Sequence, residues 1–174
     1  MRAYKSAVFA LVVFTLGALP VRAQDAKTVE VTPYVALASG VASPVGGAVT
    51  FPVTSRLSVE TDVAYRRAEG NIHALSLSAS LLYDLPRIGQ STPYVSAGVG
   101  LSKYGAPIFS SNGRPIATQP SLAMSVNAGG GLKMPMNEKL DLRTDARWVK
   151  LVGLQGPSEG FRVSQGISFG VGKR

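Results

Sequence analysis

The chain has 174 residues, of which 45% are hydrophobic and 16% are charged, a composition that suits one folded domain and argues against disorder. It has no cysteine, which excludes disulfides, thiolate metal sites and a lipoprotein anchor. The formal net charge is +8, but the basic residues form no run and no basic helix, so we expect no nucleic-acid partner. Nineteen glycines favour turns and sheet over helix.

The N-terminus has the pattern of a cleavable signal peptide. Arg2 and Lys5 precede an apolar core at 7–19, and a proline and a small-residue cleavage site follow. The core is shorter than the roughly 20 residues that a transmembrane helix needs. We therefore predict a signal peptide over 1–23 and a single domain over 24–174.

Apolar residues alternate with small or polar ones through the rest of the chain, which is the period of strands with two unlike faces. Between 140 and 151, for example, Leu140, Leu142 and Trp148 alternate with charged residues. A helix would scatter these residues around its axis, so helix is rejected. The breaks in the pattern predict eight strands: 28–39, 46–53, 57–67, 74–84, 93–103, 122–134, 140–151 and 161–172.

The lengths of strands and connections indicate a membrane barrel. Most strands have the roughly 9–11 residues that cross a bilayer at a tilt. Counted along the chain, the longest predicted connection is the fifth, 104–121. The second, 54–56, and the sixth, 135–139, are short and lie at the other end of the barrel. Outer-membrane barrels have short periplasmic turns and longer external loops. The predicted fold class is therefore all-β: an eight-stranded antiparallel up-and-down transmembrane β-barrel behind a signal peptide.

The polar face of the strands is expected to line the lumen. It consists mostly of serine, glycine and threonine, and its charges nearly balance, as burial in a closed lumen requires. Strands three and seven of eight lie roughly across the barrel from each other, so Glu60 and Asp62 can face Arg143 and Arg147. The predicted lumen ion-pair network comprises Glu60, Asp62, Arg66, Lys133, Asp141, Arg143, Asp145, Arg147 and Arg162, with Glu30 on the same face.

The apolar face is expected to contact lipid, because its charges occur only at one end. Arg67, Lys103 and Lys150 share this face at the external end, and we predict that they contact lipopolysaccharide phosphates or extend from the apolar belt into water. Aromatic residues also gather at the strand ends, as membrane girdles do. The predicted girdles are Tyr65, Trp148 and Phe161 at the external end and Phe51, Tyr83 and Phe169 at the periplasmic end.

Three segments carry a family resemblance: Thr92-Pro-Tyr-Val-Ser-Ala-Gly-Val-Gly100, Asn127-Ala-Gly-Gly-Gly-Leu-Lys133 and Asn137-Glu-Lys-Leu-Asp-Leu-Arg143. With the strand pattern, they resemble the outer-membrane β-barrel domain family of small OmpA/OmpX-like barrels. The resemblance implies location in the outer membrane of a diderm bacterium and insertion by the barrel-insertion machinery. Such barrels usually end on an aromatic residue, whereas here Phe169 is followed by Gly-Val-Gly and two basic residues.

The family includes structural tethers, adhesion proteins and a few lipid-A-modifying enzymes. The only histidine, His73, lies near Ser76 and Ser78, but these serines have the opposite parity and should point into the lumen, away from a lipid substrate. We therefore expect no enzyme and no catalytic residues. A single histidine without cysteine supplies no metal site, and a glycine run inside a strand is no phosphate loop, so no cofactor is expected.

The sequence thus predicts a small, monomeric outer-membrane barrel with a structural or interaction role, its lumen closed by side chains. Three alternatives stay open: a soluble periplasmic or secreted ligand-binding barrel, a narrow pore and a lipid-A-modifying enzyme. Outer-membrane lipid and lipopolysaccharide are the expected partners.

Overall fold

The computed structural model describes residues 28–38, 44–68, 72–109, 112, 115–137, 139–152 and 159–171. The predicted signal peptide, 1–23, lies outside these residues. No helix among them is long and apolar enough to cross a membrane. The strands are β1 (Val29–Ala38), β2 (Val45–Pro52), β3 (Leu57–Ala68), β4 (Ile72–Asp84), β5 (Thr92–Phe109), β6 (Pro115–Pro135), β7 (Leu140–Val152) and β8 (Glu159–Val171).

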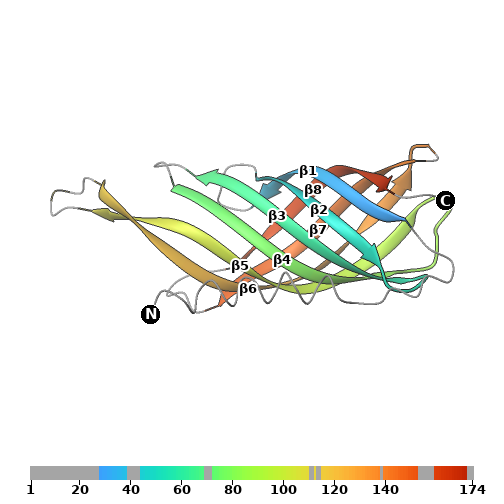
Figure 1. Cartoon of the computed structure of the whole chain (residues 1–174), viewed down its shortest axis with the longest axis horizontal. Helices are drawn as coiled ribbons and strands as arrows, with labels where there is room; N and C mark the ends of the chain where they lie inside the picture. The colour runs from blue at the N-terminus through green and yellow to red at the C-terminus, as the bar shows by residue number, and fades with distance from the viewer. Residues whose placement is uncertain are drawn as a thin grey trace.

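The eight strands form one closed barrel in sequence order, and every neighbouring pair is antiparallel (Figure 1). When cross-strand partners are followed once around the barrel from Lys150 of β7, they lead back to β7 at Leu140. The register around the barrel therefore shifts by ten residues (150 minus 140). This stagger tilts the strands, by about 35–45° in barrels generally. An eight-stranded barrel has an interior just wide enough for side chains, so the fold closes its own lumen if those side chains are large enough.

The barrel wall is polar on its inner face and apolar on its outer face, which is the reverse of a soluble protein. Serine, threonine and charged residues are buried in the lumen, whereas valine, leucine and phenylalanine side chains are exposed on the outer surface. Val99, in the middle of β5, is 58% exposed, while Glu60, in the middle of β3, is 1% exposed. An apolar surface of this extent is typical of a membrane contact and foreign to a soluble monomer. The parity predicted from alternation, polar inside and apolar outside, is therefore confirmed.

One predicted boundary is wrong. The segment 104–121 was expected to be a loop, but β5 and β6 continue to pair through most of it, to Phe109 and from Pro115. The resulting hairpin projects beyond the other strands (Figure 1). Among the described residues, β6 pairs with β7 only from Met124, and β5 pairs with β4 only up to Tyr104. The outer edges of the extension are therefore unpaired there, where proline is tolerated. These extensions of β5 and β6 could not be predicted from the sequence, because they contain prolines and lack strict alternation.

The barrel has two unlike ends. The terminal end is where β1 begins and β8 ends, and it carries the β2–β3, β4–β5 and β6–β7 connections. The distal end carries the remaining connections, among them the extended β5–β6 hairpin. These correspond to the ends that the sequence assigns to the periplasm and the exterior.

Candidate functional site: a charged cluster that closes the lumen

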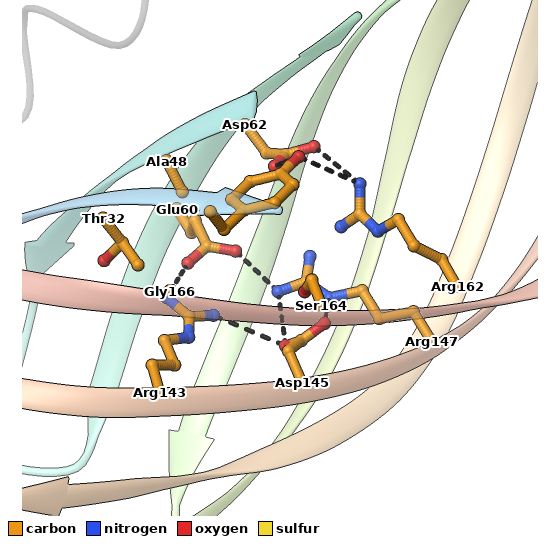
Figure 2. A pocket seen from close by; sticks show the side chains of 11 residues that line it. Thr32, Ala48, Glu60, Asp62, Arg143, Asp145, Arg147, Arg162, Ser164 and Gly166 are labelled. Carbon is orange, nitrogen blue, oxygen red and sulfur yellow. Dashed lines mark hydrogen bonds and ion pairs between the residues drawn. The ribbon is translucent and has the colours of Figure 1, made fainter. Parts of the chain in front are cut away.

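A buried carboxylate on β3 lies at the centre of the lumen. Glu60 forms ion pairs with two arginines of β7: with Arg143 through Oε2, and with Arg147 through Oε1 at 2.6 Å from Nη2. Arg147 also binds Asp145, with its Nε 2.8 Å from Oδ1. Alternation places all three β7 residues on the inner face, and β3 reaches them across the barrel (Figure 2). The structure thus brings together the residues that the sequence paired across the lumen.

Two tyrosines, which sequence analysis did not select, complete this charge network. The Tyr94 hydroxyl donates to Asp145 Oδ2 at 2.6 Å and accepts from Arg143 Nε at 2.7 Å. The Arg143 guanidinium also lies over the Tyr94 ring, 4.9 Å from its centroid. Hydrogen bonds to charged groups and cation–π contacts both gain strength where water is excluded. Tyr94 therefore fixes the positions of two oppositely charged side chains of β7, Arg143 and Asp145.

The second tyrosine forms a similar unit with different strands. The Tyr34 hydroxyl donates to Asp62, and Arg162 lies 5.4 Å from the Tyr34 ring centroid. Arg162 Nη1 forms an ion pair with Asp62 Oδ1 at 3.1 Å. Asp62 therefore pairs with β8, and the expectation that it faces the β7 arginines is wrong. Tyr34 explains the difference, because it directs the carboxylate toward β8.

Glycines on neighbouring strands make room for the two rings. Tyr94 is the cross-strand partner of Gly131, and Tyr34 is the partner of both Gly46 and Gly166. A Cβ added at Gly131 would overlap the Tyr94 hydroxyl, and one at Gly46 would lie 2.5 Å from the Tyr34 hydroxyl. The glycine run in β6 thus admits a bulky lumen side chain, one of the two roles that a glycine inside a strand suggests.

The remaining predicted lumen residues lie outside this central group. Lys133 forms an ion pair with Glu30 at 3.0 Å and lies 4.0 Å from Asp84, near the terminal end. Asp141 is half-buried at the same end. Arg66 is half-buried toward the distal end, and no hydrogen-bond or ion-pair partner for it is found among the described residues.

The central group leaves almost no free space. We define the plug as Glu60, Asp62, Arg143, Asp145, Arg147 and Arg162 with Tyr34 and Tyr94. The cavity beside it, lined by Thr32, Ala48 and most of the plug, measures about 10 Å³ (Figure 2). A cavity needs at least about 10–15 Å³ to hold one water molecule. The cavity beside the plug therefore has room for at most about one water molecule.

The outward residues that the sequence predicted lie at the strand ends. Lys103 and Lys150 are exposed on β5 and β7, whereas the side chain of Arg67 lies outside the described residues. Trp148 is half-buried, and the other predicted girdle residues are exposed on the outer face: Tyr65, Phe161, Phe51, Tyr83 and Phe169.

His73 lies on the outer face at the distal end. Its Nδ1 is hydrogen-bonded to the Tyr65 hydroxyl, and the two rings are stacked at 5.9 Å. Ser76 is bonded instead to Ser102 inside the barrel, with 2.8 Å between the hydroxyl oxygens. The histidine and the serine thus lie on opposite sides of the wall. In the described part of the chain, no group of three or more acidic or histidine side chains could hold a metal ion.

Comparison with solved structures places this fold among outer-membrane barrels. The N-terminal β-barrel domain of Pseudomonas aeruginosa OprF is 20% identical, with a TM-score of 0.66 over 82% of this chain and 96% of that chain. Neisserial surface protein A is 14% identical, with a TM-score of 0.62 over 82% and 96%. The outer membrane enzyme PagL is 19% identical, with a TM-score of 0.52 over 82% and 99%. No protein-family model and no curated protein matches the sequence.

Proposed function

We propose that this protein is a monomeric outer-membrane barrel with a structural or interaction role, and that it neither conducts solutes nor catalyses a reaction. The apolar outer face, the predicted signal peptide and the likeness to outer-membrane barrels support the location. A soluble ligand-binding barrel would turn the apolar face inward, which is the reverse of the arrangement here.

The buried plug is the observation that carries this proposal. Its charged residues come from β3, β7 and β8, and its two tyrosines come from β1 and β5. A pore needs a continuous path for water and ions, whereas an anchoring barrel needs only a stable wall. The plug therefore supports a role played by the outer surface and the distal hairpins, with the lumen serving stability.

Cell fractionation tests the location and the barrel state together. We expect the protein in the outer-membrane fraction, as a band that migrates differently on a gel when the sample is left unheated. A folded barrel resists detergent until heated, which is the reason for the shift. A soluble periplasmic protein without heat-dependent migration would contradict the proposal and restore the ligand-binding alternative.

The distal cations extend the proposal to lipopolysaccharide. Lys103 and Lys150 are exposed at this end on the lipid side, where phosphates of the outer leaflet would lie. We expect lipopolysaccharide to raise the thermal stability of the reconstituted barrel, and added salt to reduce that gain. The triple alanine variant of Arg67, Lys103 and Lys150 should lose most of it. Arg56→Ala, in the opposite β2–β3 turn, is the matched control. An undiminished gain in the triple variant would mean that these side chains only extend from the apolar belt.

The absence of catalysis is also testable. The serine nearest to His73 in sequence lies inside the wall and is bonded to Ser102, which supports a structural role for the histidine and its tyrosine partner. We expect the reconstituted barrel to release no fatty acid from lipid A. Release that is lost in His73→Ala, with unchanged heat-dependent migration, would establish the enzyme alternative.

A further inference from the structure

A second cavity lies in the lumen on the distal side of the plug. It measures about 310 Å³, compared with about 10 Å³ beside the plug. Ligand pockets in proteins usually measure about 300–1,000 Å³. We call this cavity the vestibule. Asp62, Arg162 and Asn127 line its inner part, so it ends at the plug.

The vestibule has two chemically different walls. Ser76, Ser78, Ser102 and Ser125, from three neighbouring strands, line one wall with hydroxyl groups. Val149 and Leu151 of β7 line another part, although they share the parity of the charged residues on that strand. A vestibule that held only water would gain nothing from inward aliphatic side chains. Their presence indicates an occupant with an apolar part.

The vestibule also contains one arginine, Arg66, that is not paired with a carboxylate of the described residues. Arg66 lines it, half-buried, and no described residue forms an ion pair or hydrogen bond with its guanidinium. Arg162 lines it as well; its Nη1 is paired with Asp62, but its buried Nε has no hydrogen-bond partner among the described residues. A buried donor without a partner is unfavourable, and a guanidinium in particular binds carboxylates through paired hydrogen bonds.

We propose that the vestibule binds a small monocarboxylate with a short aliphatic body. Arg66 would bind the carboxylate, the serine wall would donate further hydrogen bonds, and Val149 and Leu151 would contact the aliphatic part. Asp62 and Glu159, which also line the vestibule, would repel a dianion such as phosphate. This site goes beyond the structural role, and it requires only the barrel and its plug, because a blocked lumen can hold a ligand without transporting it.

The test is a calorimetric titration of the refolded barrel in detergent micelles, corrected against protein-free micelles. The probes are hexanoate, its uncharged analogue hexanamide, and inorganic phosphate. The variants are Arg66→Gln and, as a control with the same change in charge at the opposite end, Arg56→Gln. We expect saturable binding of hexanoate, weakened tenfold or more in Arg66→Gln and unchanged in Arg56→Gln, with hexanamide and phosphate each at least tenfold weaker.

A second variant keeps the result decisive if Arg66→Gln does not fold. Ser125→Leu fills the vestibule from the serine wall with every charge retained, and it should abolish binding of hexanoate. Absence of saturable hexanoate binding to the parent, or equal binding by the parent and either vestibule variant, would overturn the proposal. Phosphate that binds as tightly as hexanoate would overturn the assignment of an aliphatic ligand. A soluble protein in the fractionation experiment would not affect these outcomes, so the two proposals fail separately.

Discussion

The plug and the vestibule occupy the same lumen and are built from the same eight strands, yet they use inward positions in opposite ways. In the plug, each carboxylate contacts at least one arginine, and two tyrosines fix the geometry. In the vestibule, small serines leave space and Arg66 forms no ion pair or hydrogen bond with any described residue. The cavity beside the plug thus measures about 10 Å³, whereas the vestibule measures about 310 Å³. The difference depends on side-chain size and charge alone, because the backbone is continuous through both.

The largest effect of a single substitution should come from the centre of the plug. Glu60→Ala leaves Arg143 and Arg147 without their shared carboxylate, and breaking a buried ion pair costs about 3–5 kcal/mol. We expect a large fall in the urea midpoint of the refolded barrel. Glu159→Ala removes the same side chain at the exposed edge of the vestibule and should change the midpoint little. Similar effects of the two substitutions would mean that the plug does not stabilise the barrel.

A smaller loss of stability is expected when a glycine that makes room for a tyrosine ring is replaced. In Gly131→Ala the added methyl group would overlap the Tyr94 hydroxyl and a backbone oxygen of β7, and overpacking of this kind costs about 1–3 kcal/mol. At Gly47 the nearest atom to an added Cβ is 3.9 Å away, so Gly47→Ala should be tolerated. Urea unfolding of the two variants measures the difference, and equal stability would place the Tyr94 ring elsewhere.

A serine that makes two hydrogen bonds at the edge of the plug should matter less. Ser80 Oγ accepts from Arg147 Nη1 at 3.3 Å and donates to Asn127 Oδ1 at 3.2 Å. Ser80→Ala removes both hydrogen bonds, but because both are long it should cost only about 1 kcal/mol in total. The same unfolding assay checks this value, and a loss as large as that of Glu60→Ala would show that Ser80 organises the whole network.

The smallest effect on stability is expected in the vestibule. Among the described residues Arg66 has no partner to lose, so Arg66→Gln should change the free energy of unfolding by less than about 0.5 kcal/mol in the absence of ligand. Urea unfolding of Arg66→Gln without and with hexanoate measures the stability of the variant and the stabilisation that the ligand adds. A strong destabilisation without ligand would show that Arg66 belongs to the stabilising network.

Alternation fixes which residues face the lumen, because a strand has a period of two, and the sequence therefore predicted Glu60 opposite Arg143 and Arg147. It could not predict that Asp62 pairs with Arg162, since that choice depends on the Tyr34 hydroxyl. The signal for both tyrosines was nevertheless present: each has the parity of the polar face, in strands whose other inward residues are mostly small. The extended β5–β6 hairpin escaped prediction because paired strands beyond the barrel wall have no lipid-facing side to impose alternation.

Thiol labelling tests the contrast between plug and vestibule most directly, because the natural chain has no cysteine and any introduced thiol is unique. Ser76 and Ser80 lie four residues apart on β4 with the same inward parity, the first lining the vestibule and the second bonded to the plug. In the folded barrel, a small charged thiol reagent should modify Ser76→Cys rapidly and Ser80→Cys only after unfolding. Equal rates at the two positions would show that water and solutes reach the plug, and would contradict a closed lumen.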